Sequence, residues 1–315
     1  MIKTPICELL GIKYPIFQGG MAWIADAQLA AAVSNGGGLG IISAMNAEGE
    51  WLRAEIKKVR ELTDKPFGVN IMLMSPYVDQ VAEIVAEEKV PVVTTGAGNP
   101  SKYMKAWIEA GVKVIPVVPS TAIAKLTARN GAAAVIAEGG ESGGHVGEIT
   151  TMALVPQVCD AVDVPVLAAG GIADGRGVAA AFMLGASGVQ LGTRFLSAEE
   201  CGVHPVYKQK ILKAKDIDTM TTGKRLGHPV RTLKTPFAKE FQKKEYDSSI
   251  SDGELEAFGA GSLRAAAVLG DERKGSFMAG QIAALVKKEQ PAADIISEIF
   301  EEAEGVLSGG MKWVK

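Results

Sequence analysis

Eight short apolar runs, repeated at intervals of about 20–30 residues, restrict the possible folds of this chain more than any other feature. Each run is almost continuously apolar, which is typical of parallel strands covered by helices on both faces. The runs begin at Tyr14, Gly38, Phe67, Val90, Lys113, Ala133, Val164 and Gly188. Because a doubly wound open sheet usually stops at about five or six strands, this pattern predicts a closed α/β barrel, the (β/α)8 or TIM barrel.

Glycines mark the ends of several helices in this pattern. Gly111, Gly131 and Gly185 each stand just before a predicted strand, where a helix commonly ends in a left-handed residue. With 315 residues, of which 47% are hydrophobic, the chain can bury a large core without a metal or a disulfide.

The pattern changes after the eighth strand and divides the chain into three expected parts. Residues 1–195 form the barrel. Residues 196–271 have no clear strand period and predict a small, mainly helical lid or substrate domain inserted after strand eight. Residues 272–315 are expected to return to the barrel as a helix entered through a turn at Gly275 and an amphipathic helix from Ala292.

Charge is concentrated in one part of the expected lid. Residues 208–244 hold eleven Lys and Arg against three Asp and Glu, although the whole chain has a net charge of −3. This segment would attract an acidic partner, and a solvated helical face is an equally simple interpretation. The net charge gives no reason to expect nucleic acid or membrane binding.

Cysteine usage and the first residues bear on the compartment. The three cysteines are far apart and form no C-x-x-C pair, so neither a zinc site nor a disulfide framework is expected. The start of the sequence lacks the features of a signal peptide, and no apolar run is long enough to span a membrane. A reducing cytoplasm is the predicted location.

Glycine and polar residues gather where the predicted strands end. In barrels the active site lies at the carboxyl ends of the strands, so this asymmetry predicts a site there. The candidates are Gln18, Gly19, Gly20 and Met21 after the first strand, Asn70 after the third, Gly143, Gly144 and His145 after the sixth, Ala169, Gly170 and Gly171 at the seventh, and Gln190, Gly192 and Thr193 at the eighth.

The ends of strands seven and eight indicate a phosphate site. Bare backbone at Gly170, Gly171 and Gly192 allows close approach, Thr193 adds a hydroxyl, and a following helix N-terminus supplies partial positive charge. The simpler alternative is that these glycines only permit tight turns.

His145 is the outstanding titratable candidate. It lies in a glycine-rich loop beyond a predicted strand, where it could donate a proton or bind a developing oxyanion. An exposed loop histidine is the alternative. His204 and His228 each precede proline and are interpreted as turn or lid residues, and no motif of a serine or zinc hydrolase occurs.

Two amide side chains complete the expected mouth of the barrel. Gln18 and Asn70 would suit a heterocycle that presents both donors and acceptors, such as a flavin, or each could cap a helix instead. Residues 96–101 read GAGNPS and lack the third glycine of a dinucleotide fingerprint, so no Rossmann domain is expected.

Nine motifs in order carry a resemblance that covers nearly the whole chain. They are PIFQGGMAW, GGGLGII, FGVNIML, TTGAGNPSKYM, VIPVVPS, ESGGHVG, AAGGIADG, VQLGTRF and FMAGQIA. Together they resemble the nitronate monooxygenases (2-nitropropane dioxygenases) and the related flavin-dependent enoyl-acyl-carrier-protein reductases II. The strings DKPFGVNIML, VTTGAGNPSKYM, HPVYKQKILKAKDIDT and MAGQIA look closer to the reductases.

The resemblance implies an FMN cofactor across the barrel mouth. Its phosphate would lie at Gly170, Gly171, Gly192 and Thr193, and its ring near Gly19, Gly20, Met21 and Asn70. Further contacts are implied from Gln190, Met278 and Gln281. The implied reaction is NADH- or NADPH-dependent reduction of an enoyl thioester, a CH–CH oxidoreduction of bacterial fatty acid synthesis, with hydride passing through flavin N5. His145 would orient or polarise the thioester and supply a proton.

The resemblance also implies partners. An acidic acyl carrier protein would present the thioester, in agreement with the basic segment. A homodimer is expected, as is a monovalent cation held by backbone carbonyls near the lid, to which the sequence assigns no ligands.

Three alternatives remain open at this point. A nitronate monooxygenase would use the same fold, FMN and histidine with oxygen. An inosine-monophosphate-type dehydrogenase would need a loop cysteine, and Cys7, Cys159 and Cys201 lie outside the strand-end loops. A non-catalytic flavin- or phosphate-binding protein is the third.

Overall fold

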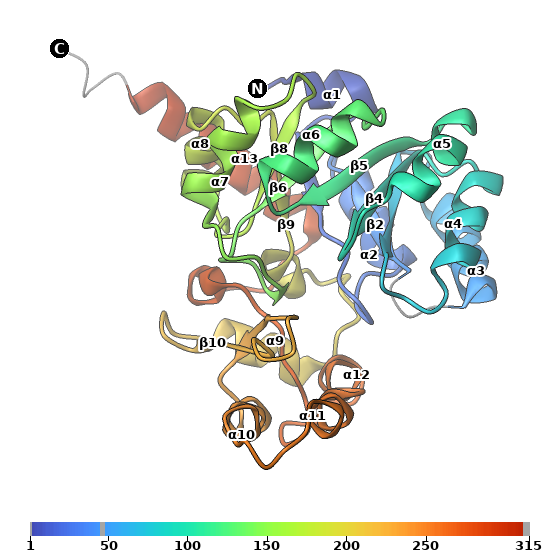
Figure 1. The fold of residues 1–315 in the computed structure, drawn as a ribbon. Helices are drawn as coiled ribbons and strands as arrows, with labels where there is room; N and C mark the ends of the chain where they lie inside the picture. Colours follow the sequence, from blue (N-terminus) through green and yellow to red (C-terminus); the bar gives the residue numbers. More distant parts are fainter. Residues whose placement is uncertain (1, 45–47, 311–315) are drawn as a thin grey trace.

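The computed structural model describes residues 2–44 and 48–310 and contains the predicted (β/α)8 barrel (Figure 1). Eight parallel strands follow the order β1-β9-β8-β6-β5-β4-β3-β2 around the barrel. They are β1 (Ile16–Gln18), β2 (Gly40–Ser43), β3 (Phe67–Met72), β4 (Val92–Gly96), β5 (Lys113–Val118), β6 (Val135–Glu138), β8 (Val166–Ala169) and β9 (Gly188–Leu191). Each strand falls within or beside a predicted apolar run, so the apolar pattern identified the barrel correctly.

Seven of the helices that cover the outside of the described barrel connect its successive strands. They are α2 (Ala27–Asn35), α3 (Gly49–Leu62), α4 (Val78–Glu87), α5 (Ser101–Glu109), α6 (Thr121–Arg129), α7 (Thr151–Cys159) and α8 (Gly175–Met183). Gly111, Gly131 and Gly185 have φ of 83°, 92° and 98° after α5, α6 and α8, which confirms the predicted left-handed helix ends.

The amino-terminal end of the barrel is closed by the short helix α1 (Pro5–Leu10). Its Ile6 and Leu10 join Phe17, Ile115 and Leu167 in one buried cluster inside the barrel. Since apolar side chains fill this end, only the opposite end has room for a ligand.

The barrel closes between β1 and β2 through very few backbone contacts. Phe17 and Leu39 form the single bridge described there, and Leu39 N donates to the Ile16 carbonyl at 2.9 Å. The side chain of Gln18 continues the seam, because its Nε2 donates to the Ile41 carbonyl at 3.2 Å and its Oε1 accepts from Ile41 N at 3.1 Å. A fully buried amide side chain thus pairs with β2 as a backbone peptide would.

Residues 196–271, which we call the lid, are mainly helical, as predicted, and also contain two short strands that the sequence pattern did not reveal. Its elements are α9 (Pro205–Leu212), β10 (Thr219–Thr222), β11 (Val230–Leu233), α10 (Pro236–Glu245), α11 (Asp252–Gly259) and α12 (Ser262–Ala267). Strands β10 and β11 pair antiparallel, and β11 also pairs with β7 (Gly144–His145) from the barrel. Each lid strand has only four residues: β10 reads TMTT and β11 reads VRTL. Neither is a continuous apolar run, so the search for apolar runs in the sequence did not find these strands.

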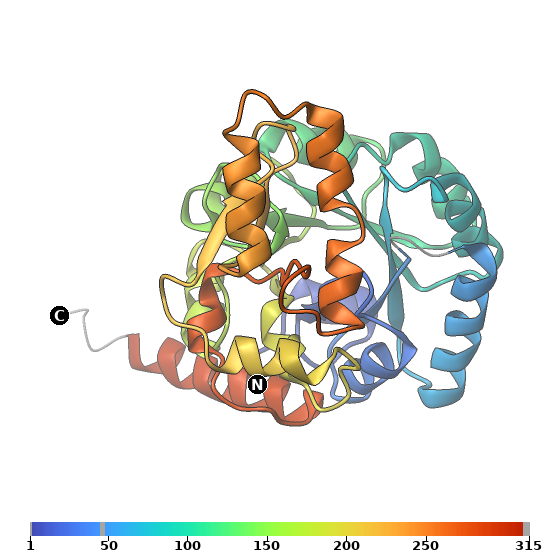
Figure 2. The same ribbon diagram turned by 90° about the horizontal axis from the view of Figure 1, so that it is seen from below.

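The lid has a small apolar core of its own. Phe237, Phe241 and Leu255 are buried together, and the ring of Phe258 stacks on that of Phe237. Viewed along the barrel, the helices of the lid lie across the end of the barrel at which the strands terminate (Figure 2). The three-part division remains a prediction, and its ends at residues 1 and 315 lie outside the described residues.

The segment after the lid is only partly helical. The helix predicted from Gly275 is wrong, because Met278 bridges Thr232 of β11 and only the short 3-10 helix η2 (Gln281–Leu285) follows. The predicted helix from Ala292 is confirmed as α13 (Ala292–Gly309). It buries Ile299 and Phe300 and packs against α8 and α2, as expected. Within the described ranges, no helix has both the length and the apolar character needed to cross a membrane.

The seam between β1 and β2 leads to a prediction for stability. Gln18→Ala would leave the N–H and C=O of Ile41 buried without partners, so we expect the free energy of unfolding to fall by about 2–4 kcal/mol in urea denaturation. Gln157→Ala is the control, since its exposed side chain bonds only to Ala153 in its own helix, and less than about 0.5 kcal/mol should be lost. Equal losses in the two variants would contradict the proposed role of Gln18.

Candidate active site

A cavity of about 640 Å³ lies between the carboxyl ends of the strands and the lid. Its wall combines strand ends of the barrel with Tyr207 and Arg264 from the lid. The predicted site residues that line it are Gly19, Gly20, Met21, Asn70, Gly143, Gly144, His145, Ala169, Gly170, Gly171, Gln190, Gly192, Thr193 and Met278. The strand-end rule therefore identified residues between Gly19 and Thr193 that line one cavity, whereas Met278 had been added by the family resemblance.

Two predicted residues lie outside the cavity lining. The expectation that the amide of Gln18 faces the mouth is wrong, because this amide is fully buried against β2. Gln281 starts η2, has an exposed side chain and donates its backbone N–H to the Glu141 carbonyl at 2.9 Å. A cofactor contact of either residue remains a prediction.

Glycine leaves bare backbone around the cavity. Gly170 and Gly171 have φ of 87° and 73°, a left-handed conformation that residues with a side chain rarely adopt. A Cβ on Gly170 would lie 2.7 Å from the Gly139 carbonyl oxygen, and one on Gly20 would lie 2.4 Å from Cβ of Asn70. These positions need glycine for the chain to pass, and the exposed peptide groups then become available to a ligand.

The helix after β8 does not contribute free N–H groups. In α8, Gly175 N donates to Glu302 at 2.7 Å, and Arg176 N and Gly177 N donate to the side chain of Asp174. These three N–H groups are therefore held by Asp174 and by Glu302 of the C-terminal helix, and a phosphate at this helix N-terminus remains a prediction. A phosphate here would depend on the glycine turns and Thr193.

Asn70 is held by a neighbouring strand instead of capping a helix. The hydroxyl of Thr94 donates to Oδ1 of Asn70 at 2.9 Å. This hydrogen bond occupies the amide oxygen, so the N–H groups are what the side chain offers to a ligand.

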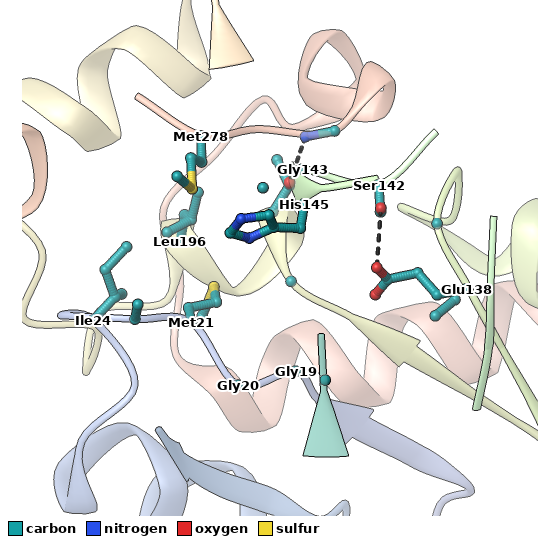
Figure 3. A pocket seen from close by; sticks show the side chains of 18 of the residues that line it. Gly19, Gly20, Met21, Ile24, Glu138, Ser142, Gly143, His145, Leu196 and Met278 are labelled. Atoms are coloured by element: carbon teal, nitrogen blue, oxygen red, sulfur yellow. Dashed lines mark hydrogen bonds between the residues drawn. The ribbon is translucent and has the colours of Figure 1, made fainter. Parts of the chain in front are cut away.

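His145 lies in a short strand and not in a free loop, which corrects the sequence interpretation. It is paired with Val230 in the register of β7 and β11. Its ring faces the cavity beside Met278 and Leu196 (Figure 3). Solvent reaches the side chain, yet the surrounding protein removes enough water to lower the pKa of His145, and the charge of His228 lowers it further. Both effects favour the neutral imidazole over its charged form.

Glu138 is a site residue that the sequence reasoning missed. It ends β6, lines the cavity and accepts a hydrogen bond from the Ser142 hydroxyl at 3.2 Å (Figure 3). Burial raises the pKa of Glu138 to about 7. Its position at the end of a predicted strand could have identified it, but the sequence reasoning chose His145 in the loop that follows.

Several contacts fix the loop that carries His145. The Glu141 carboxylate accepts from the N–H and the hydroxyl of Thr151, both at 2.9 Å. Arg231 of the lid donates to the Gly140 carbonyl at 2.9 Å. Barrel and lid therefore hold this loop together, which preorganises the imidazole.

The cysteines take no part in the cavity. Cys7 and Cys201 are buried, Cys159 belongs to α7, and none of the three lines the cavity. This argues against a dehydrogenase with a loop cysteine nucleophile. No group of three or more His, Cys, Asp and Glu side chains within the described ranges could hold a metal, and the monovalent cation remains a prediction.

This barrel, with a glycine-lined cavity closed by a lid and flanked by a neutral imidazole, belongs to the class of α/β-barrel oxidoreductases. The chain belongs to the nitronate monooxygenase family, whose model, "Nitronate monooxygenase", matches residues 3–83 and 74–302. The family predicted from the sequence motifs is thereby confirmed.

Three similar proteins were compared with the chain by sequence identity and coverage. The structure of FabK from Thermotoga maritima is 51% identical, with a TM-score of 0.97 and complete coverage (100%) of both chains. A (3aS,4S,5R,7aS)-5-hydroxy-7a-methyl-1-oxo-octahydro-1H-indene-4-carboxyl-CoA dehydrogenase of Mycobacterium tuberculosis is 40% identical over 76% of this chain and 69% of its own length. A probable nitronate monooxygenase of Staphylococcus saprophyticus is 33% identical over 98% of this chain and 99% of its own.

Glu138 makes stability depend on pH in a definite direction. Because its folded-state pKa of about 7 lies above the ordinary value of 4.5, the folded protein binds more protons between these values, and stability is lost as pH rises through this window. We expect a loss of about 2 kcal/mol between pH 4.5 and 7.5, since water in the cavity screens part of the effect.

Glu138→Gln should remove this component from urea denaturation curves measured across the window. Glu83→Gln, which changes an exposed carboxylate on α4, should leave the slope as it is in the unaltered protein. A slope that survives in Glu138→Gln would assign the pH dependence to other groups.

Proposed function

We propose that this protein is an FMN-dependent enoyl-acyl-carrier-protein reductase that uses NADH or NADPH. The observation that carries the proposal is the 51% identity to FabK over the complete length of both chains, lid included. The nitronate monooxygenase relative spans the chain as fully at 33% identity, so the monooxygenase is the second candidate.

The residues of the cavity fit a flavin nucleotide. Gly170, Gly171, Gly192 and Thr193 would hold its phosphate, because their peptide groups and hydroxyl border the cavity without side chains in the way. Gly19, Gly20 and Met21 would lie along its ring, and the Asn70 amide N–H would donate to a ring acceptor. When bound, the cofactor supplies the capacity to accept a hydride from a reduced nicotinamide and to return it to a carbon–carbon double bond.

His145 would act on the thioester. Its neutral imidazole can donate an N–H hydrogen bond to the thioester carbonyl oxygen, which draws electron density from the double bond and favours attack at the β-carbon. In the proposed reaction the imidazole would also supply the proton that the α-carbon gains, and the imidazolate left behind would take a proton from water. Because β7 pairs with β11, the imidazole holds its position without help from a substrate.

Anaerobic stopped-flow absorbance measurements separate the two candidates. The flavin-loaded protein is reduced with NADH and mixed with a crotonyl thioester in one experiment, and mixed with a nitronate and oxygen in another. Fast reduction by NADH followed by reoxidation with the thioester is expected. Slow reduction with fast turnover of nitronate and oxygen would assign the monooxygenase activity, and a protein that binds no flavin would contradict both.

The role of His145 gives a prediction in the same assay. His145→Ala should leave reduction by NADH nearly unchanged, while the rate of reoxidation by crotonyl thioester falls about a hundredfold. His145→Asn keeps a hydrogen-bond donor but no transferable proton. It should recover activity only if orienting the carbonyl is what matters. Unchanged reoxidation in His145→Ala would show that the imidazole does not act on the thioester.

An acyl carrier protein would meet a smaller basic surface than the sequence suggests. In the segment 208–244, Lys208, Lys210 and Arg225 bind Glu289, Glu272 and Asp252 within the protein. The whole lid holds twelve Lys and Arg against eleven Asp and Glu. Exposed lysines without a described carboxylate partner are Lys213, Lys215, Lys224, Lys234, Lys239 and Lys243. Lys213 and Lys234 line one groove of about 340 Å³, whose wall also includes Asp218 and the Lys210–Glu272 ion pair. We infer that Lys213 and Lys234 receive acidic side chains of the carrier.

Charge reversal tests this docking surface. The double variant Lys213→Glu and Lys234→Glu should raise KM for a crotonyl thioester on the carrier protein about tenfold, with no change for a pantetheine thioester. Lys57→Glu with Lys125→Glu, on the outer helices α3 and α6, makes the same change in net charge elsewhere and should have little effect. If both double variants raised KM equally, the effect would come from the net charge of the protein and not from the groove.

A further inference from the structure

The cavity holds very little positive charge. Of the described residues that line it, Arg264 is the single lysine or arginine, whereas two carboxyl groups, Glu138 and Glu141, also border it. The pKa of His145 is lowered by burial and by His228, which disfavours a positive charge on its ring. An anionic group that enters the cavity therefore finds one permanent cation, and this cation comes from α12 of the lid.

Arg264 is exposed and has no acidic partner in the part of the chain that the structure describes. No carboxylate of the described residues lies within the 4.0 Å of an ion pair, and its side chain makes none of the described hydrogen bonds. A guanidinium carries about five N–H donors in a planar fork, and this geometry matches a phosphate or a carboxylate. The donors of Arg264 are thus available to a ligand.

Trp23 holds Arg264 in place from the barrel side. The guanidinium carbon lies 5.7 Å from the centre of the Trp23 ring, within cation–π distance. Trp23 has a left-handed backbone with φ of 63°, which costs about 1 kcal/mol in a residue other than glycine. The side chain is 45% exposed and lines the cavity. Strain of this kind concentrates where function requires a fixed side chain, here at the rim of the cavity.

The phosphate of the cofactor does not need Arg264. In the proposed function the glycine turns after β8 and β9 would hold that phosphate on the barrel side, whereas Arg264 lies on the lid. The remaining anions are those of the exchangeable ligands. Both ligands of the proposed reaction carry a phosphate: the nicotinamide nucleotide and the phosphopantetheine arm of the thioester.

We propose that Arg264, positioned by Trp23, is the binding site for the phosphate group of the ligand that exchanges over the cofactor. This rests on the proposed function. The shared chemistry is a phosphate ester that reaches the mouth between β1 and α12 while the reactive end of the ligand lies deeper, near His145.

Calorimetric titration of the oxidised, flavin-loaded protein tests this site, with two ligand pairs that each differ only in a phosphate. One pair is crotonyl-pantetheine and crotonyl-4′-phosphopantetheine. The other is nicotinamide riboside and nicotinamide mononucleotide. Arg264→Ala should weaken the phosphate-bearing member of one pair about 10- to 100-fold and leave its phosphate-free partner unchanged. Which pair responds identifies the source of the phosphate.

Three further variants make the test specific. Arg264→Lys keeps the charge without the fork and should retain part of the phosphate preference. Trp23→Phe keeps an aromatic face and should retain most of it, whereas Trp23→Ala should lose it in part. Arg129→Ala, at the exposed end of α6, removes the same charge elsewhere and should bind every ligand as the unaltered protein does.

Two outcomes overturn the proposal. Either Arg264→Ala keeps the full preference for phosphate in both pairs, or the unaltered protein shows no such preference in either. The proposed function fails separately, in the stopped-flow measurement. If no thioester were reduced while Arg264→Ala still lost a phosphate preference, the phosphate site would stand and the reductase assignment would fall.

Discussion

Closure of the barrel is the constraint on which the rest of the structure depends. Strand β1 contributes only three residues, and it must pair with β9 on one side and reach β2 on the other. The register with β9 is regular, but the seam to β2 relies on one bridge and on the buried amide of Gln18. The chain continues directly from this seam into Gly19, Gly20 and Met21, so the wall of the cavity inherits its position from the closure of the barrel.

The electrostatics of the cavity follow from the burial of two titratable side chains. Burial moves the pKa of Glu138 upward and that of His145 downward, and both shifts favour the uncharged form. Because the pKa of Glu138 is about 7, this carboxyl group is divided between its charged and uncharged forms near neutral pH. Either side chain can exchange a proton with a bound molecule at a small free-energy cost, because neither must first break a strong ion pair.

Most of the barrel was predictable, because parallel strands buried on both faces leave a strong apolar signal and their carboxyl ends must meet. The lid strands were not, since β10 is built of threonines and a methionine whose pairing depends on β11. The strand-end rule correctly placed His145 and Asn70 at the cavity. It was wrong for Gln18, because the sequence does not reveal whether an amide side chain faces a ligand or bonds to a neighbouring strand. Arg264 was also missed, since the packing of the lid brings it to Trp23.

Strand β7 has a consequence for how the molecule can open. The imidazole of His145 stands on a strand of the barrel loop, but that strand is hydrogen-bonded to β11, and Met278 bridges β11 from its other end. A displacement of the lid large enough to admit a bulky ligand must either carry His145 with it or break the pairing with Val230. Ligand entry and the alignment of His145 are then coupled. The reacting groups would be in position only when the lid is closed, and the protein would not catalyse the reaction while the lid is open.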